Sequence, residues 1–583
     1  MTNSPVPVSP LQLPSSFNFA TDVVDYWARR DPTQVALYWT NQSLSESKQL
    51  TYLNFSRQSH RISHLLASLG IKQGETCILI SSRIPAWWEV ATACLRSGVI
   101  VCPCTTLLVD KDIESRLQVS QAAAFVGDEA SVAKCLKVRQ RCPKLRSIIQ
   151  IEGKVEAKDV VDFHASLARI PQDADFPVPG SLTPISPALT FFTSGTTGPP
   201  KVVLHTQTSY PLAHALTGIH WLQLSPGQIY WNLSEQGWAK AAWSFFSSWN
   251  CGATLFIHDD RQPFSAKRTL QVLNQFPITT LCAPPTVYRQ LVLDETRAFF
   301  ETPQGRPRAL RHCCGAGEPL NESVIRTWKD MTGGIDIFDA YGQTETTVIC
   351  ANQKANPVKP GSMGKPIPGV PLTIIDADGN VTDNGVEGDI AIAISRDAST
   401  LKRKDAFFGI FEGYIDRATG QIDNKIKTFA NGNRFFITGD RASRDSDGYF
   451  WFVGRSDDVI NSSGYRIGPF EVESTLKLHP AVVESAVVAS PDPARDEVVK
   501  AFIVLTDSAF SKIRSSPPST QETELIKELQ GFCKENAAPY KYPRKIEFVD
   551  AKFLPKTISG KIKRAELKAL EKRRYEEGKR AKL

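Results

Sequence analysis

The chain has 583 residues, of which 42% are hydrophobic and 22% are charged, and its formal net charge is +7. This is an ordinary globular composition, and the length is too great for a single hydrophobic core, so several domains are expected. The long apolar region at residues 77–109 is interrupted by three charged residues, which argues against a membrane-spanning helix.

Short apolar runs alternate with helical patterns through the first part of the chain. Such runs are TCILISS from Thr76, AAAFVG from Ala122 and RSIIQI from Arg146, whereas DIESRLQVSQ from Asp112 has helical spacing. This rhythm indicates an α/β fold.

A glycine-rich loop, FTSGTTGPPKVVLHT, occupies Phe192 to Thr206. Its glycines expose backbone N–H groups, and its hydroxyls and Lys201 offer further donors to an anion such as a triphosphate. Only two residues separate Gly195 from Gly198, and two prolines precede the lysine, so this is not a Walker loop. The flanks predict strand, loop, strand, with a helix no earlier than about Ser209. A plain hairpin turn is the alternative, but a turn does not require three threonines, a serine and a lysine.

The second half of the chain changes character twice. Residues 357–440 contain strand pairs around Asp-Gly and Gly-Asn turns and predict a β-rich subdomain. Within them, the polar and weakly periodic residues 396–433 are interpreted as a long surface excursion. From Asp457, two strands around a loop, the amphipathic helix TELIKELQGFCKENA and the strand KIEFVD predict a small α+β domain.

The C-terminal end carries the basic charge. Residues 541–583 contain fifteen Lys or Arg and six Asp or Glu, a balance of +9 that leaves the remainder near −2. No motif that reads nucleic acid is present, and there is little aromatic interleaving beyond Tyr540 and Tyr542. A phosphorylated small-molecule ligand and a solvated C-terminal helix explain the charge more economically.

The cysteines and histidines show no ligand spacing. The 12 cysteines form no C-x-x-C pair, the 9 histidines are scattered, and the N-terminal stretch MTNSPVPVSPLQLPSS lacks an apolar signal core and an Arg-rich amphipathic helix. We therefore expect reduced thiols inside the cell, with neither a zinc site nor a disulfide framework.

Four further stretches follow the glycine loop: YGQTETT at Tyr341, FITGDRASRDSDGYFWFVGRSDD from Phe436, INSSGYRIGPFEVE from Ile460 and LPKTISGKIKR from Leu554. In this combination and order they resemble the adenylate-forming superfamily, and NSSGYRIGP, HPAVVESAVVASPDP and APYKYPRKIEF are similar to the medium-chain acyl-CoA synthetases within it. The resemblance implies an α/β protein with a large N-terminal domain of α/β subdomains and a β-rich subdomain at residues 1–456. A small, mobile α+β C-terminal domain is implied at residues 457–583.

The resemblance also implies two half-reactions. A carboxylic acid and ATP give an acyl-AMP and pyrophosphate, and the thiol of coenzyme A then displaces AMP, so ATP, Mg²⁺ and coenzyme A are the implied cofactors. Such a site must supply cations and directed donors where negative charge develops. The implied substrate is a medium-chain or similarly sized acid, with aryl and branched acids included.

The family's ATP site maps onto several segments. The glycine loop is implied to hold the β- and γ-phosphates, Thr344 to meet the α-phosphate and Glu345 to ligate Mg²⁺. Asp440 is similar to the aspartate that accepts hydrogen bonds from the ribose, and Lys561 to the mobile lysine that bridges the carboxylate and α-phosphate oxygens. For these residue types alone, a solvated glutamate, a turn aspartate, surface ion pairs and a solvated lysine are the alternatives. The implied nucleotide and catalytic residues are Thr193, Ser194, Gly195, Thr196, Thr197, Gly198, Lys201, Gly315, Glu318, Asp339, Ala340, Tyr341, Gly342, Gln343, Thr344, Glu345, Asp440, Arg455, Arg466 and Lys561.

The C-terminal residues are implied to change places between the two steps. Asp457 resembles the hinge, where a rotation would withdraw Lys561 and bring a strand with room for the pantetheine arm to the active site. Cations around an aromatic ring suit the phosphorylated adenine nucleotide of coenzyme A. The implied coenzyme A residues are Ser463, Gly464, Tyr465, Arg495, Lys534, Tyr542 and Arg544.

Trp238, Gly342 and Thr347 are implied to line the acyl pocket. Gly342 stands where acetate-specific relatives carry a bulky tryptophan, which favours a longer or aryl acid. Glu235-Gln236 and Thr347 depart from the family pattern and leave the shape of the pocket open.

The last residues, Ala581-Lys582-Leu583, approximate the S-K-L address and predict transport by the peroxisomal import receptor, with the cytoplasm or mitochondrial matrix as alternatives. Two other functions also stay open. One is an adenylating enzyme that passes the acyl group to a carrier protein or another acceptor. The residues that resemble the family's coenzyme A contacts argue against this function. The other is a catalytically silent nucleotide-binding protein, against which Lys561, Glu345 and Asp440 argue.

Overall fold

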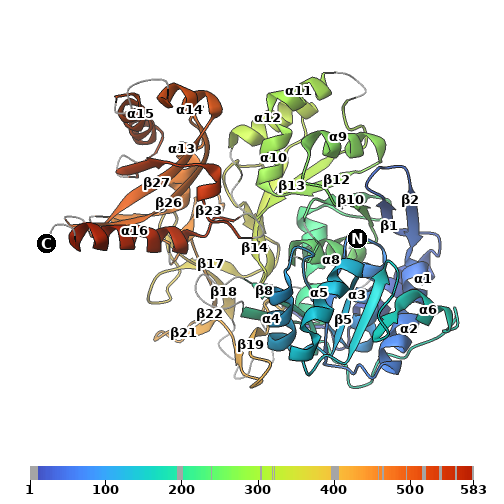
Figure 1. Cartoon of the computed structure of the whole chain (residues 1–583). Coiled ribbons are helices and arrows are strands. Elements are labelled where there is room, and N and C mark those ends of the chain that lie inside the picture. Colours follow the sequence, from blue (N-terminus) through green and yellow to red (C-terminus); the bar gives the residue numbers. More distant parts are fainter. Residues whose placement is uncertain are drawn as a thin grey trace.

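The computed structural model describes residues 11–193, 201–234, 236–237, 239–301, 305–317, 320, 322–394, 406–456, 458–462, 465–493, 496–514, 520–537, 541–557 and 561–580. Strands in these ranges form two nine-stranded sheets and two five-stranded sheets. Figure 1 shows helix-flanked sheets in the larger part of the chain and a smaller unit around β26, β27 and α16 at its left. The α/β fold class, with a large N-terminal and a small C-terminal part, is confirmed.

The first large sheet has the order β20-β19-β9-β8-β4-β3-β5-β6-β7. Its side chains alternate: Cys77 and Leu79 enter the central core shared with α2 and α3, whereas Ile78 and Ile80 pack with α4 and α5 on the other face. This period of two is what a strand buried on both faces requires. The bounds are α2 (Tyr52–Ser68), β3 (Thr76–Ile80), α3 (Ala86–Ser97), β4 (Ile100–Pro103), α4 (Asp110–Ser120), β5 (Ala124–Asp128), α5 (Glu129–Val138), β6 (Ser147–Glu152), β7 (Val160–Asp162), α6 (Phe163–Ala168), β8 (Pro187–Thr193), β9 (Lys201–Thr206), β19 (Gly413–Ile415) and β20 (Ile422–Asp423).

The second large sheet has the order β16-β15-β14-β13-β12-β10-β11-β1-β2, and β10 to β14 run parallel to one another in it. Its outer face packs Leu270, Tyr288 and Trp328 from the covering helices, and its inner face meets the central core. The bounds are α1 (Asp25–Arg30), β1 (Val35–Thr40), β2 (Ser47–Thr51), α7 (His214–Leu216), β10 (Ile229–Asn232), α8 (Ala239–Asn250), β11 (Thr254–His258), α9 (Ala266–Gln275), β12 (Thr280–Ala283), α10 (Pro285–Leu291), α11 (Asp294–Phe300), β13 (His312–Ala316), α12 (Glu322–Thr332), β14 (Ile337–Gln343), β15 (Thr347–Ala351) and β16 (Lys365–Pro366).

A five-stranded antiparallel sheet follows and confirms the β-rich character predicted for residues 357–440. It has the order β17-β18-β22-β21, with β23 paired to β22. The bounds are β17 (Leu372–Ile375), β18 (Gly388–Ile394), β21 (Ile426–Thr428), β22 (Arg434–Arg444) and β23 (Phe450–Arg455).

The surface excursion predicted at residues 396–433 is wrong for residues 406–413, nearly all of which are buried, whereas most of residues 416–433 are exposed as predicted. Phe407, Phe408 and Phe411 are at most 1% exposed and belong to the central core. Beyond them, β19 extends the first large sheet next to β9. These buried aromatic residues have no regular spacing, so periodicity could not reveal them.

The C-terminal part is a separate α+β unit, as predicted. Val487 and Ala489 face one side of its sheet, whereas Ala486 and Val488 face the other, where Leu567 of α16 packs. A boundary at Asp457 stays a prediction, because that residue lies outside the described ranges. The bounds are β24 (Ile460–Ser462), β25 (Tyr465–Ile467), α13 (Pro469–Leu476), β26 (Val482–Asp492), β27 (Asp496–Leu505), α14 (Asp507–Arg514), α15 (Thr520–Asn536), β28 (Lys545–Phe548) and α16 (Arg564–Arg580).

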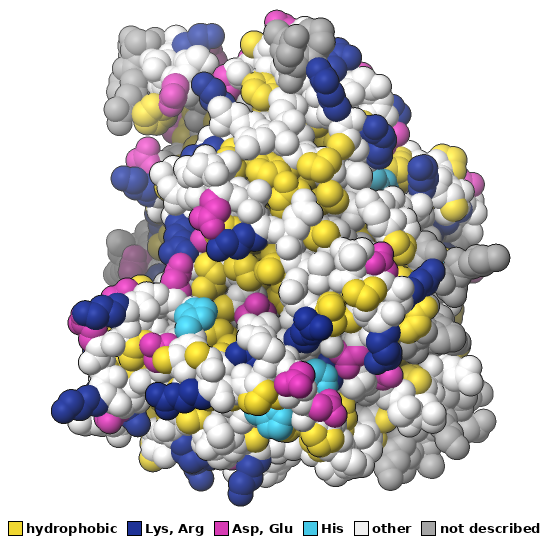
Figure 2. Space-filling view, turned by 90° about the vertical axis from the view of Figure 1, so that its right-hand side faces the viewer, with side chains coloured by type: hydrophobic (Ala, Val, Ile, Leu, Met, Phe, Trp, Pro, Cys, Tyr) yellow, Lys and Arg dark blue, Asp and Glu magenta, His cyan; other side chains and the backbone are white. Residues whose placement is uncertain are grey.

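All 12 cysteines are buried and free of disulfide bonds. Among the described helices, none has the length and apolar character needed to cross a membrane. The face in Figure 2 carries charged side chains of both signs interspersed with hydrophobic ones. This mixture accords with a small net charge outside the C-terminal end of the chain.

Candidate active site

Gly315, a predicted nucleotide-site residue, and the start of the YGQTETT stretch lie on neighbouring strands. Because β13 and β14 are parallel, their carboxyl ends meet at one edge of the sheet, where Gly315 pairs with Asp339. Lys240, which the sequence analysis did not select, donates from Nζ to the carbonyl oxygen of Ala316 at 2.5 Å. The carboxyl end of β13 is therefore held by α8 as well as by the sheet.

Three predicted residues converge on the carboxylate of Asp440. The Tyr341 hydroxyl donates to its Oδ2 at 2.6 Å, and the Gln343 side-chain amide donates to the same oxygen. Arg455 is the register partner of Asp440 on β23, with Nε 3.7 Å from Oδ1. Burial raises the pKa of Asp440, and the bonds from Tyr341 and Gln343 and the charge of Arg455 oppose that rise. The result is a buried carboxylate held at a fixed position on β22.

Glu345 lies in the turn after β14 and meets β19, which pairs with the strand that follows the glycine loop. The Tyr414 hydroxyl donates to Glu345 Oε1 at 2.7 Å, and Lys201 Nζ lies 4.5 Å from the centre of the Tyr414 ring. The turn is held from β9, where His205 Nε2 is 2.6 Å from the carbonyl oxygen of Thr344. Because a carbonyl oxygen only accepts, His205 carries its proton on Nε2 in this arrangement. The structure thus brings Lys201, Thr344 and Glu345 together.

The sequence analysis missed three residues of this cluster. His205 is a fully buried polar residue within the apolar flank KVVLHT, a break in the pattern that could have drawn attention. Tyr414 and Lys425 come from the segment interpreted as a surface excursion, and no local signal marks them. Lys425 Nζ donates to the carbonyl oxygen of Thr438 at 3.2 Å, next to Asp440.

The two strands predicted on either side of the glycine loop are confirmed. β8 and β9 are antiparallel, and Thr193 at the end of β8 pairs with Lys201 at the start of β9. The following helix begins at Thr208, one residue before the expected limit. Predicted residues that lie outside the described ranges are Ser194, Gly195, Thr196, Thr197, Gly198, Trp238, Glu318, Asp457, Ser463, Gly464, Arg495 and Ala581-Lys582-Leu583.

Gly342 and Thr347 lie diagonally across the tight connection between β14 and β15, where Gly342 pairs with Val348 and Thr347 with Gln343. Thr347 has φ = 64°, is 3% exposed, and its hydroxyl oxygen has no hydrogen-bond partner among the described residues. A β-branched residue at positive φ is strained. A Cβ on Gly342 would lie 2.0 Å from the carbonyl oxygen of Thr347. The backbone alone therefore requires glycine at position 342, and the opening of an acyl pocket there stays a prediction.

Replacing Thr347 with glycine is expected to raise stability. The change relieves a left-handed backbone conformation that costs about 1–2 kcal/mol, against a glycine cost of about 0.5–1 kcal/mol in the unfolded chain. It also removes the unpartnered hydroxyl. Thermal melts of Thr347→Gly and Thr347→Ala separate the two effects, because alanine removes the hydroxyl but keeps the strained Cβ. A glycine variant that melts below the alanine variant would contradict the strain argument.

Three of the predicted coenzyme A residues form one cluster in the C-terminal part. Lys534 Nζ lies 4.3 Å and Arg544 Cζ 5.0 Å from the centre of the Tyr542 ring, and Arg544 Nη1 donates to the Tyr542 hydroxyl at 2.9 Å. Tyr465 and Arg466 have their backbone on β25. A ring flanked by two cations can stack on an adenine and bind its phosphates.

Lys561 is exposed on the turn that precedes α16. Its backbone N–H donates to Thr557 Oγ1 at 3.1 Å, and the Thr557 N–H donates to its carbonyl oxygen at 2.8 Å. Just beyond the turn, Arg564 forms a buried ion pair with Glu473 of α13 at 2.7 Å. The backbone of the turn is thus anchored while the ammonium stays free to move.

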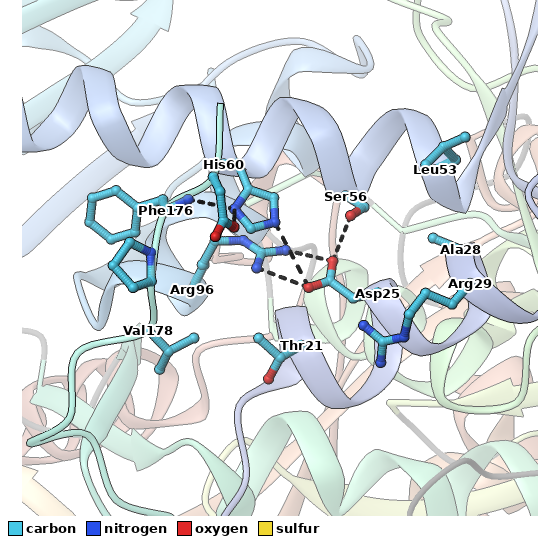
Figure 3. Close-up of a pocket in the computed structure, with 12 residues that line it drawn as sticks. Thr21, Asp25, Ala28, Arg29, Leu53, Ser56, His60, Arg96, Phe176 and Val178 are labelled. Carbon is cyan, nitrogen blue, oxygen red and sulfur yellow. Dashed lines mark hydrogen bonds and ion pairs between the residues drawn. The ribbon is translucent and has the colours of Figure 1, made fainter. Parts of the chain in front are cut away.

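A cleft of about 380 Å³ between α1, α2, α3 and residues 175–178 contains none of the predicted residues. Figure 3 shows its polar group: Arg96 pairs with Asp25 at 2.7 Å, Ser56 donates to the same carboxylate at 2.6 Å, and His60 lies beside it. These charges satisfy one another and tie three helices together.

Comparison with known proteins agrees with this geometry. Residues 24–396 match the family model of the AMP-binding enzymes, and residues 471–561 match that of the AMP-binding enzyme C-terminal domain. The chain therefore belongs to the AMP-binding enzyme family. Curated relatives that match nearly the whole chain are acyl-CoA synthetases, which confirms the predicted resemblance, enzyme class and reaction class.

Three relatives show the extent of the similarity. Human mitochondrial acyl-coenzyme A synthetase ACSM5 is 42% identical over 567 residues, covering 96% of this chain and 91% of that protein. Rat mitochondrial acyl-coenzyme A synthetase ACSM4 is 43% identical over 560 residues, covering 95% and 90%. The crystal structure of the anthranilate CoA ligase AuaEII in complex with anthranoyl-AMP is 26% identical, with a TM-score of 0.78 and coverage of 96% and 98%.

The predicted peroxisomal location is wrong, and the import receptor predicted with it is not supported. The curated relatives are named as mitochondrial proteins, and this chain matches nearly their whole length. Three residues similar to S-K-L form a short match that arises easily by chance, whereas the similarity to mitochondrial enzymes extends over more than 90% of the chain.

Proposed function

We propose that this protein joins a medium-chain or similarly sized carboxylic acid to coenzyme A, with ATP converted to AMP and pyrophosphate. The observation that carries this proposal is the convergence of two carboxylates, Glu345 and Asp440, with the cations Lys201 and Arg455 where three sheets meet. Such a constellation suits a nucleotide whose phosphates need cations and whose ribose needs a fixed acceptor. The enzyme uses ATP, Mg²⁺ and coenzyme A.

In the first half-reaction, a carboxylate oxygen attacks the α-phosphorus and pyrophosphate leaves. Asp440 holds the ribose, Lys201 binds the outer phosphates, and Thr344 donates toward the α-phosphate. Lys561 enters from the C-terminal part to neutralise the charge shared by the carboxylate and phosphate oxygens. No proton transfer is required, because the attacking carboxylate is already ionised.

The residues present fit a magnesium ion at Glu345. One carboxylate oxygen accepts from Tyr414, and the other accepts no hydrogen bond from the described residues. The described residues contain no cluster of three possible ligands, which suits Mg²⁺, an ion that proteins hold by one or two carboxylates together with substrate phosphates. When bound, the ion neutralises the phosphate charge during pyrophosphate departure.

In the second half-reaction, the thiol of coenzyme A attacks the acyl carbon and AMP leaves. Lys534, Tyr542 and Arg544 bind the nucleotide part of coenzyme A. A rotation at Asp457 exchanges the Lys561 turn for the strand that carries Ser463, Gly464 and Tyr465. The names of the relatives support a location in the mitochondrial matrix.

The test is pyrophosphate release from ATP with acids from acetate to dodecanoate, benzoate and phenylacetate, each with and without coenzyme A. We expect release that depends on the acid, peaks between four and twelve carbons or at an aryl acid, and is accompanied by acyl-CoA when coenzyme A is present. If no acid in the panel caused pyrophosphate release although ATP still bound, the proposal would be contradicted.

A further inference from the structure

Lys425 occupies the point where two sheets meet beside the proposed nucleotide site. It lies between β20, at the edge of the first large sheet, and β21, in the five-stranded sheet. Its Nζ is 3.2 Å from the Thr438 carbonyl oxygen and 5.9 Å from the centre of the Tyr414 ring. A Cβ built on Gly439 would be 3.8 Å from Lys425 Nζ and 3.9 Å from Arg455 Nη2. Both cations therefore approach the backbone just before Asp440.

The charges around Lys425 belong to the same constellation. Three cations, Lys201, Lys425 and Arg455, surround the carboxylates of Glu345 and Asp440, and the exposed carboxylate of Asp423 also acts on Tyr414. Partial burial lowers the pKa of Lys425, Arg455 and Lys201 act in the same direction, and Glu345 and Asp440 oppose it. Within the described residues, no carboxylate comes within ion-pair distance of Lys425. An anion placed here would give Lys425 an ion-pair partner.

The hydrogen bonds of Lys425 leave it able to bind such an anion. An ammonium group has three N–H donors, and the Thr438 carbonyl oxygen uses one. A partly buried cation with donors to spare is costly without a partner. Its position is also specific: Asp440 marks the ribose end of the proposed site, and Lys201 and Glu345 mark the end of the outer phosphates. The α-phosphate connects these ends.

We propose that Lys425 is a catalytic residue that binds the α-phosphate of the nucleotide from the N-terminal part of the enzyme. This inference rests on the proposed ATP-dependent function. Because the Ile437 N–H of β22 donates to the Lys425 carbonyl oxygen at 3.0 Å, Lys425 stays beside Asp440 and holds the phosphate in both half-reactions, unlike Lys561. It stabilises the charge that builds on the α-phosphate oxygens when pyrophosphate leaves, and again when AMP leaves.

The experiment compares the binding of adenosine, AMP and ATP with Mg²⁺ to the full-length enzyme by calorimetry. Lys425→Met keeps the apolar stem and removes the charge. A charge-assisted hydrogen bond is worth about 1.5–3 kcal/mol, so affinity for AMP and ATP should fall by about 10-fold or more. Adenosine should bind as it does to the wild type, and Lys425→Arg should recover part of the loss.

Lys427→Ala is the matched control, because Lys427 lies two residues away on β21 and is exposed. It should leave all three affinities unchanged, and a thermal melt should show both variants folded. AMP affinity unchanged in Lys425→Met would overturn the α-phosphate assignment, even if ATP binding fell. An equal loss for adenosine and AMP would assign Lys425 a structural role through Thr438. Wild-type enzyme that binds none of the nucleotides would instead contradict the proposed function.

Discussion

Replacing Lys561 with alanine is expected to slow acyl-AMP formation by about 100-fold or more, while transfer of a supplied acyl-AMP to coenzyme A stays within about threefold of wild type. Lys561 is exposed on a turn whose backbone is held by Thr557, so the variant should fold and melt as the wild type does. The unequal effect follows because the ammonium neutralises charge only while the carboxylate attacks ATP.

Single-turnover measurements separate the two half-reactions. The first is followed by pyrophosphate release without coenzyme A, and the second by acyl-CoA formation from synthetic acyl-AMP. Lys563→Ala is the control, because Lys563 belongs to the same basic segment and its ammonium pairs with Glu566 at 2.8 Å on the surface. If Lys561→Ala slowed both half-reactions equally, the proposed exchange of the Lys561 turn between the steps would be wrong.

Replacing Asp440 with asparagine is expected to weaken the binding of adenosine, AMP and ATP by a similar factor of about 10 to 100. The carboxylate accepts bonds from Tyr341 and Gln343 on one oxygen and faces Arg455 with the other. An asparagine must turn its NH₂ group either toward two donors or toward a guanidinium, so it cannot reproduce this arrangement. The ribose would lose a charged acceptor, and every ligand that contains ribose would be affected.

Calorimetry with adenosine is the decisive measurement for Asp440, because adenosine has a ribose but no phosphate. Asp389→Asn serves as control, since Asp389 lies on β18 of the same sheet and its partners are Arg441 and Ser456. Full adenosine affinity in the Asp440 variant would rule out the ribose contact. Together with Lys425→Met, this variant divides the site into a ribose end and a phosphate end.

Local sequence patterns were sufficient for several strands of the two large sheets. Alternating apolar residues predicted strands such as β3 and β5, and the apolar flanks of the glycine loop predicted the β8 and β9 pair. The five stretches in order also indicated the family. These properties depend on residues close in sequence, whose spacing directly reflects the period of a strand or a helix.

The glycine at position 342 has a structural requirement that the sequence did not reveal. Sequence comparison suggested that it leaves room for an acyl group, whereas the structure shows that a side chain there would collide with the Thr347 carbonyl oxygen. The collision depends on how β14 returns into β15, and the chain alone does not reveal that path.

The sequence by itself determined the element types, the family and the residue types that the adenylation chemistry needs. Only the tertiary structure decided that Tyr414 and Lys425 join Glu345 and Asp440, because β19 and β21 add to two different sheets. The Tyr414 hydroxyl reaches a glutamate 69 residues away, and the bond depends on sheet register and on core packing of phenylalanines without periodic spacing. Long-range contacts of this kind arise from the packing of whole sheets, so no local sequence pattern predicts them.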